Sequence, residues 1–231
     1  MSARPRFAAR AVLFDLDGTL LDTITDLADA ANLTLAELGR PLRSQDEIHS
    51  FVGKGIPNLV RRCMTEGAAA SEDEIDTAVG VFRQHYARVN GVRTRIYPGV
   101  TELLGTLRAC GLPLAVVTNK AEAFTLPLLA RMDIAHYFDT VVSGDTLPVK
   151  KPDPAVVHLA CERLGVSAAE ALMIGDSAND AFAARGAGMP VLLVSYGYSE
   201  GVPVDTIECD GLLSTALNAL DYLALDYIRR A

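Results

Sequence analysis

The chain has 231 residues, half of them hydrophobic, and carries a formal net charge of −8 at pH 7. This length is sufficient for one large hydrophobic core, or for a core with a smaller inserted unit. The acidic balance leaves no basic surface for a phosphate backbone or an anionic bilayer, so we expect neither nucleic acid nor a membrane as a partner.

The cysteines and the N-terminal region indicate a reducing compartment. Cys63, Cys110, Cys161 and Cys209 lie far apart and form no Cys-x-x-Cys pair, a distribution that fits neither a zinc site nor a compact disulfide framework. The first ten residues hold no apolar stretch of signal-peptide length, and no later segment approaches roughly eighteen continuous apolar residues. We therefore expect a cytoplasmic protein with reduced cysteines.

Five short apolar runs predict the strands of a sheet. The runs cover 11–14, 114–117, 140–142, 171–174 and 191–194. Continuous rather than alternating hydrophobicity is typical of parallel strands that are buried on both faces. Helical periodicity follows Pro98-Gly99 and Pro154, and each of the two patterns ends at a glycine. This alternation of strand and helix predicts an α/β fold with a Rossmann-like, doubly wound parallel sheet.

A helical insertion interrupts this alternation between residues 21 and 91. The segment contains no convincing strand, and apolar stripes with helical spacing cover its first and last parts. Ser71 and Glu74 have the spacing of a capping box at the start of the second stripe. We therefore predict a core made of residues 1–20 and 92–231, with an all-helical cap domain, residues 21–91, inserted between its two parts.

Polar side chains follow the strands at their carboxyl ends, where ligands collect in an open α/β sheet. These residues are Asp15 and Asp17, Thr118 and Asn119, Lys150 and Lys151, and Asp176 and Asp180. Taken singly, each is compatible with a turn or a helix cap. Carboxylates held together at the edge of an apolar sheet need a cation to neutralise them, however, and the coincidence at four strand ends favours a functional site.

Four segments carry a recognisable order and spacing. They are Asp15-x-Asp17-Gly18-Thr19, Thr118-Asn119, Lys151-Pro152 and Gly175-Asp176-x-x-x-Asp180. These segments resemble the four ordered motifs of the haloacid dehalogenase superfamily of phosphotransferases. Within it, the chain is similar to phosphoglycolate phosphatases in weaker flanking stretches, which include 51–55, 97–100, 117–120, 151–154 and 196–198. The resemblance implies a phosphatase that acts on a small anionic phosphate monoester, with 2-phosphoglycolate as the first expected substrate.

The resemblance also implies roles for these residues. Asp15 is the implied nucleophile that becomes an aspartyl phosphate, and Asp17 is the implied general acid and base. Residues two apart in an extended segment point the same way, so both side chains can reach one phosphate ester. Thr118 and Asn119 are implied to bind phosphoryl oxygens, and Lys151 to offset the negative charge.

A metal site follows from the same resemblance. Asp176 is implied to bind the ion together with the Asp15 carboxylate and the Asp17 backbone carbonyl. These ligands are hard oxygens, which favour Mg²⁺ over zinc. Asp180 is expected to lie outside the ligands and to orient Lys151 or a metal-bound water. Charge alone does not distinguish Lys151 from its neighbour, but only Lys151 stands directly before the proline of the motif.

The loop Gly53-Lys54-Gly55-Ile56-Pro57 is the most suggestive part of the insertion. Glycines before a proline in the first helical turn present backbone N–H groups at a helix start, which attract anions, and Lys54 adds a full charge. We predict that Gly53, Lys54 and Gly55 bind the carboxylate of the substrate. A glycine-rich turn with an exposed lysine is the alternative interpretation.

Other functions share parts of this pattern. A receiver domain of a signalling protein also surrounds a phosphorylated aspartate with acids, a threonine and a lysine, although its length and the cap argue against it here. Within the superfamily, some enzymes replace the second acid of the first motif, so Asp17 favours an ester substrate. Pyrophosphate and sugar phosphates remain alternative substrates, and the chain is expected to be a monomer or a homodimer.

Overall fold

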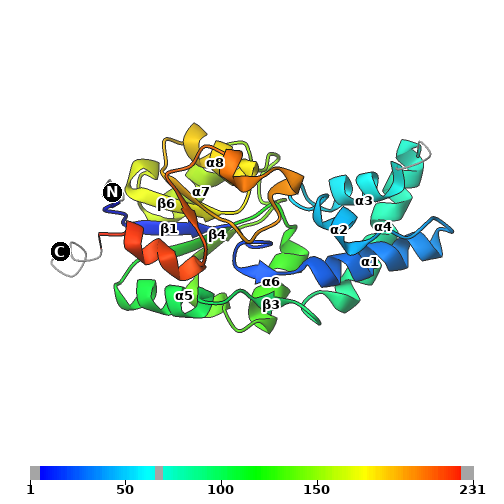
Figure 1. Cartoon of the computed structure of the whole chain (residues 1–231), viewed down its shortest axis with the longest axis horizontal. Helices are drawn as coiled ribbons and strands as arrows, with labels where there is room; N and C mark the ends of the chain where they lie inside the picture. Colours follow the sequence, from blue (N-terminus) through cyan, green and yellow to red (C-terminus); the bar gives the residue numbers. More distant parts are fainter. Residues whose placement is uncertain (1–5, 66–69, 225–231) are drawn as a thin grey trace.

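The computed structural model describes residues 6–65 and 70–224. Its centre is a six-stranded parallel sheet in the order β5-β4-β1-β6-β7-β8 (Figure 1). The strands are β1 (Ala11–Phe14), β4 (Leu114–Val117), β5 (Thr140–Val142), β6 (Ala171–Gly175), β7 (Val191–Val194) and β8 (Gly211–Leu213). Leu13 of β1 lies opposite Ala115 on one side and Met173 on the other, so β1 is a central strand.

Helices cover both faces of this sheet (Figure 1). They are α5 (Val100–Ala109) and α6 (Glu122–Arg131) on one face, and α7 (Ala155–Leu164) and α8 (Ala178–Gly186) on the other. Val12 and Phe14 of β1 pack in the cluster of α5 and α6, whereas Ala11 and Leu13 pack in the cluster of α7 and α8. Successive side chains of a strand point to opposite faces, so burial on both faces explains the unbroken apolar runs. The predicted Rossmann-like α/β fold is confirmed.

Each of the five predicted strands is present, and β6 is longer than predicted by one residue, Gly175. The sequence did not indicate β8, in which only Leu213 is fully buried. It also did not indicate α6, which contains Pro127. Short 3-10 helices occupy Ala135–Tyr137, Ala168–Glu170, Ser199–Gly201, Val204–Thr206 and Ala216–Tyr222.

A second lobe, on the right of Figure 1 and called the cap from here on, contains four helices in its described residues. They are α1 (Ile24–Glu37), α2 (Gln45–His49), α3 (Ile56–Thr65) and α4 (Glu72–Val89). The cap has its own hydrophobic cluster, which includes Leu27, Leu59 and Phe82. The predicted capping box is present, since Glu74 N donates to Ser71 Oγ at 3.3 Å and Ser71 N donates to Glu74 Oε2 at 2.8 Å.

A two-stranded ribbon links the cap to the sheet. In this ribbon β2 (Leu21–Asp22) runs antiparallel to β3 (Arg95–Ile96). The expectation that residues 21–91 contain no strand is therefore wrong at β2. Two residues are too few to show a periodicity, because the pattern of a strand needs about four residues to be recognised.

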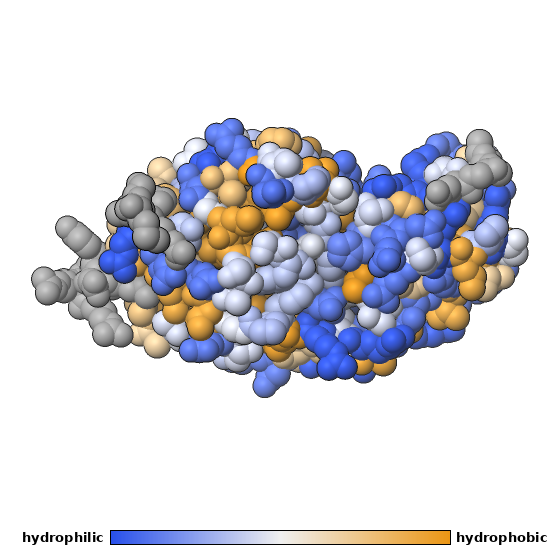
Figure 2. All heavy atoms as spheres, viewed as in Figure 1, coloured by the Kyte–Doolittle hydropathy of each residue, from blue (hydrophilic) through white to orange (hydrophobic). Residues whose placement is uncertain are grey.

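The limits of the predicted domains, 1–20, 21–91 and 92–231, stay a prediction, and residues 1–5, 66–69 and 225–231 of these ranges lie outside the described part of the chain. In the described part, no helix combines the length and the apolar character needed to cross a bilayer. On the face drawn in Figure 2, hydrophilic residues are spread over both lobes. Each of the four cysteines is free of a disulfide, as expected.

Candidate active site

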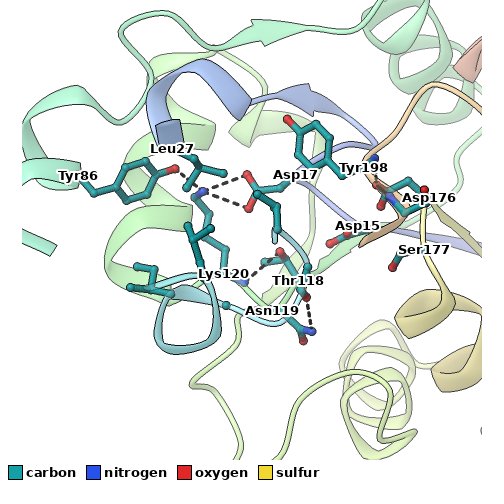
Figure 3. Close-up of a pocket in the computed structure, with 16 residues that line it drawn as sticks. Asp15, Asp17, Leu27, Tyr86, Thr118, Asn119, Lys120, Asp176, Ser177 and Tyr198 are labelled. Atoms are coloured by element: carbon teal, nitrogen blue, oxygen red, sulfur yellow. Dashed lines mark hydrogen bonds and ion pairs between the residues drawn. The ribbon is translucent and has the colours of Figure 1, made fainter. Parts of the chain in front are cut away.

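The carboxyl ends of three neighbouring strands bring the predicted acids and the threonine together (Figure 3). Asp15 follows β1, Thr118 follows β4, and Asp176 follows β6. Asp15 N donates to Ile174 O at 2.9 Å, and Thr118 N donates to Val142 O at 2.9 Å. The hydrogen bonds of the sheet therefore continue into Asp15 and Thr118, whereas Asp176 N donates to Asp180 Oδ2 at 3.2 Å.

A glycine in the first motif permits the approach of Asp176. Gly18 has a φ of +89°, and a Cβ atom at this position would lie 2.3 Å from Asp176 Oδ2. Both the left-handed backbone and the close approach exclude a larger residue. The glycine turn after Asp17 is thus a condition for bringing Asp176 against the first motif.

Lys151 is buried between two carboxylates. Its Nζ lies 2.7 Å from Asp15 Oδ1 and 2.6 Å from Asp180 Oδ1. Burial alone would lower the pKa of the Lys151 ammonium, but the charges of Asp15 and Asp180 raise it above the usual value of a lysine. The structure therefore places Lys151, rather than the adjacent Lys150, against Asp15 as a permanent positive charge.

Burial disfavours the ionised forms of Asp15 and Asp176, and Lys151 offsets this effect only in part. Burial raises the pKa of Asp15 to about 6, although Lys151 acts in the opposite direction. Burial, followed by the charge of Asp15, raises the pKa of Asp176 well above its usual value. Oxygens of Asp15, Asp176 and Asp180 all lie within 4.8 Å of one another. This set of hard donors fits a divalent cation, which would stabilise the ionised carboxylates.

Both carboxylate oxygens of Asp180 accept hydrogen bonds from the protein. Oδ1 accepts from Lys151 Nζ at 2.6 Å, and Oδ2 accepts from Ser177 N at 3.1 Å, Ser177 Oγ at 2.9 Å and Asp176 N at 3.2 Å. The predicted contact between Asp180 and Lys151 is present. Asp180 thus fixes the lysine and the turn that carries Asp176, and its own lone pairs are already engaged.

Asp17 has a cationic partner that sequence reasoning missed. Lys120 Nζ lies 3.0 Å from Asp17 Oδ1 and 3.1 Å from Oδ2, and it donates to the hydroxyl of Tyr86 in α4 at 2.5 Å (Figure 3). Thr23 Oγ1 also donates to Asp17 Oδ1, at 2.8 Å. Lys120 directly follows Thr118-Asn119 at a strand end, and this position was the available signal.

Asn119 joins the core to the glycine loop of the cap. Its Nδ2 donates to Gly53 O at 2.9 Å and to Lys151 O at 3.0 Å. Gly53 and Gly55 line the cavity described below, but the Lys54 side chain points elsewhere: it is 56% exposed and its Nζ lies 3.3 Å from Glu200 Oε2. A contact between Lys54 and a substrate stays a prediction.

A cavity of about 40 Å³ lies between the strand ends and the cap. Its polar wall includes Asp15, Asp17, Thr118, Asn119, Lys120 and Asp176, and its apolar wall consists of Leu27, Val52, Ile56 and Leu59. Such a cavity, with charged and hydrogen-bonding groups on one wall and aliphatic groups on the other, suits a small polar ligand. The cap would shield this ligand from bulk solvent.

The sequence pattern of the haloacid dehalogenase-like hydrolase family matches residues 12–194, a range that contains all four motifs. The chain belongs to this family. It is accordingly a hydrolase, and the resemblance that the motifs indicated is confirmed.

Named relatives cover nearly the whole chain. A phosphoglycolate phosphatase of Nitrosospira multiformis is 49% identical over 212 residues, which are 91% of this chain and 93% of the relative. One of Thiobacillus denitrificans is 45% identical with the same coverage. The crystal structure of a predicted phosphoglycolate phosphatase from Haemophilus somnus has a TM-score of 0.88 at 32% identity, and the match covers 92% of this chain and 97% of that one. The relatives are thus phosphoric monoester hydrolases.

Proposed function

We propose that this enzyme hydrolyses 2-phosphoglycolate to glycolate and inorganic phosphate. The observation that supports this function most is the position of Asp15 at the end of the central strand, 2.7 Å from Lys151 Nζ and in one cluster with Asp176. The similarity to phosphoglycolate phosphatases over 91% of the chain supports the choice of substrate. The small cavity supports a short leaving group.

In the first step, a carboxylate oxygen of Asp15 attacks phosphorus, and the bond between phosphorus and the leaving oxygen breaks. Asp17 donates a proton to that oxygen, so glycolate leaves with a neutral hydroxyl group. The Thr118 hydroxyl and the Asn119 backbone N–H bind the phosphoryl oxygens. Lys151 stabilises the negative charge that Asp15 and the phosphoryl group share.

In the second step, a water molecule attacks the phosphorus of the aspartyl phosphate. Asp17, now ionised, accepts a proton from this water, and the bond between phosphorus and the Asp15 oxygen breaks. Inorganic phosphate is released, and both aspartates return to their starting states. One water is consumed in each turnover, and Asp17 carries the only proton that moves through the protein.

We assign the metal site to Asp15, Asp176 and the backbone carbonyl of Asp17, with Mg²⁺ as the ion. Carboxylate and carbonyl oxygens fit a hard cation, which when bound offsets negative charge on the phosphoryl oxygens. Asp180 stays outside the ligands because its oxygens already accept hydrogen bonds from Lys151 and the Ser177 turn. A cytoplasmic location and a monomeric or homodimeric state remain predictions from the sequence.

The test is a comparison of kcat/KM with Mg²⁺ for 2-phosphoglycolate, pyrophosphate, sugar phosphates and nucleotides. We expect 2-phosphoglycolate to have the highest value, EDTA to abolish turnover and Mg²⁺ to restore it. Asp15→Asn serves as the blank and lowers kcat by at least about 10³-fold, because the nucleophile is lost. A preference for pyrophosphate or a sugar phosphate contradicts the assigned substrate. A phosphoryl group that persists on the wild-type protein identifies a signalling domain.

A further inference from the structure

The strongest feature that the proposed mechanism leaves unexplained is the ammonium group of Lys120. It is 5% exposed and lies in the wall of the cavity. Among the described residues that line this cavity, Lys120 is the sole lysine or arginine. A buried ammonium group is costly unless a negative charge lies beside it. The negative partner of Lys120 is Asp17.

The hydrogen bonds of Lys120 leave capacity for a ligand. An ammonium group has three N–H donors. Asp17 takes one direction, with both of its oxygens 3.0 to 3.1 Å away, and the Tyr86 hydroxyl takes a second at 2.5 Å. The Tyr86 oxygen accepts from Lys120, so the hydroxyl hydrogen of Tyr86 can itself donate. The positive charge of Lys120 and the O–H donor of Tyr86 thus lie side by side in the wall of one cavity.

We propose that Lys120 and the Tyr86 hydroxyl bind the carboxylate of the substrate, and that this pair makes the enzyme selective for phosphorylated short carboxylic acids. The inference rests on the proposed function and specifies which residues recognise the leaving group. It assigns to a buried lysine of the core the role that the sequence suggested for Lys54, whose ammonium is paired with Glu200 instead.

The covalent structure of 2-phosphoglycolate fits this arrangement. Two bonds separate the oxygen that leaves phosphorus from the carboxylate carbon, so the group that protonates the oxygen and the group that binds the carboxylate must be neighbours. Asp17 and Lys120 are neighbours at 3.0 Å. Lys120 N also donates to Thr118 Oγ1 at 3.2 Å, so one short segment carries both the proposed phosphoryl ligand and the ammonium.

The test compares two substrates of the same shape, 2-phosphoglycolate and its amide, in which a neutral carboxamide replaces the carboxylate. In Lys120→Met, the ratio of kcat/KM for the acid to kcat/KM for the amide falls about ten- to a hundredfold, as expected for the loss of a hydrogen-bonded charge. Loss of support for Asp17 lowers both rates by the same factor and leaves the ratio unchanged. The ratio therefore separates carboxylate binding from positioning of the general acid.

Each outcome decides between named alternatives. A wild-type enzyme that does not prefer the acid does not recognise the carboxylate and overturns this inference, whereas the substrate comparison above decides the proposed function. A wild-type preference that survives in Lys120→Met overturns the role of Lys120 alone, and a preference lost in Lys54→Met assigns the carboxylate to the cap loop. Tyr86→Phe keeps the ring and removes only the hydroxyl, so it tests the proposal independently if Lys120→Met does not fold. In this variant the ratio of kcat/KM for the acid to kcat/KM for the amide must fall severalfold. An unchanged ratio in that variant also contradicts the proposal.

Discussion

Lys151, Asp15 and Asp180 form a buried cluster of charges, and removal of any one of them is expected to lower the free energy of unfolding. Taking a charge out of water is unfavourable, and each member offsets that cost for its neighbours. Asp180 also accepts hydrogen bonds from the turn that carries Asp176. Its side chain therefore supports both the lysine and a second acid of the site.

Removal of Asp180 is expected to destabilise the whole protein. Asp180→Ala leaves buried N–H groups of the turn without an acceptor and Lys151 with one carboxylate fewer, so we predict a loss of about 3–5 kcal/mol in the free energy of unfolding. Urea denaturation measures it. Glu72→Gln, which removes the exposed partner of Arg61, is the matched control and should leave the midpoint unchanged. Equal effects of both changes would contradict the prediction.

The reactivity of the cysteines follows from their burial. Burial raises the pKa of Cys63 to about 12 and that of Cys161 to about 11. Only the thiolate reacts, so at pH 8 iodoacetamide should modify the half-buried Cys110 and Cys209 before these two. The raised pKa also means that labelling of Cys63 accelerates about tenfold per pH unit from pH 8 to 10. Peptide mass spectrometry measures the rates, and urea should equalise them.

The sequence identified the acids of the site but not their partners. Asp15, Asp17 and Asp176 could be predicted because carboxylates are unusual directly after buried apolar strands. The position of Lys120 after Thr118-Asn119 was a signal, but its contact with Tyr86 could not be predicted because Tyr86 comes from another lobe. The contact of Lys54 with Glu200 could not be predicted for a similar reason: Glu200 lies far along the chain.

At the scale of elements, strands that are buried on both faces were the most predictable part of the fold. Their apolar runs need no partner to be recognised, whereas the linker strands β2 and β3 form through pairing with each other. The edge strand β8 is half exposed and has no continuous apolar run. Local sequence therefore predicted the central strands and the apolar edge strand β5, whereas β2, β3 and β8 depend on tertiary contacts.

Helix α1 is attached to the returning linker by one buried side chain. Asp26 accepts hydrogen bonds from the backbone N–H groups of Gly91, Arg93 and Thr94, at 2.9 to 3.0 Å, and from Thr94 Oγ1 at 2.6 Å. Its carboxylate is fully buried. The side chain therefore fixes where the chain leaves the cap and where it returns.

This attachment predicts a large effect of one substitution. Asp26→Ala leaves several buried donors unsatisfied, so we expect a loss of about 3 kcal/mol or more in the free energy of unfolding, measured by urea denaturation. Asp29→Ala on the same helix removes only an exposed pair with Arg93 and should cost less than about 1 kcal/mol. Comparable losses in the two variants would show that Asp26 does not fix the linker.

At the scale of the whole molecule, Gly53 is one of the residues through which the cap meets the core, together with Lys54 and Tyr86. The Gly53 carbonyl accepts from Asn119, and the Gly53 backbone has a φ of +142°. A Cβ atom at Gly53 would lie 2.2 Å from Glu200 Oε1, the same carboxylate that pairs with Lys54. The close approach of this loop to the core thus depends on the absence of a side chain at Gly53.

We predict that Gly53→Ala lowers kcat/KM for 2-phosphoglycolate by at least about tenfold, because the strained backbone and the displaced Glu200 prevent the loop from docking on the core. Steady-state kinetics measures the effect. Gly80→Ala in α4 is the matched control, since a Cβ there meets nothing within 4 Å and alanine favours the helix. Full activity of Gly53→Ala contradicts the importance of this contact.

The ribbon of β2 and β3 has a consequence for how such an enzyme can change its preferences. The cap leaves the sheet at Asp22 and returns at Arg95, two residues that face each other across one ladder. Neighbouring strands lie about 4.8 Å apart, so any helical unit whose ends are that close can be joined to the same core. Asp15, Asp17, Lys151 and Asp176 all lie outside this segment. The contribution of the cap to the proposed leaving-group site, which includes Tyr86 but not Lys120, can therefore be replaced as one unit, while Asp15, Lys151 and Asp176 remain in the core.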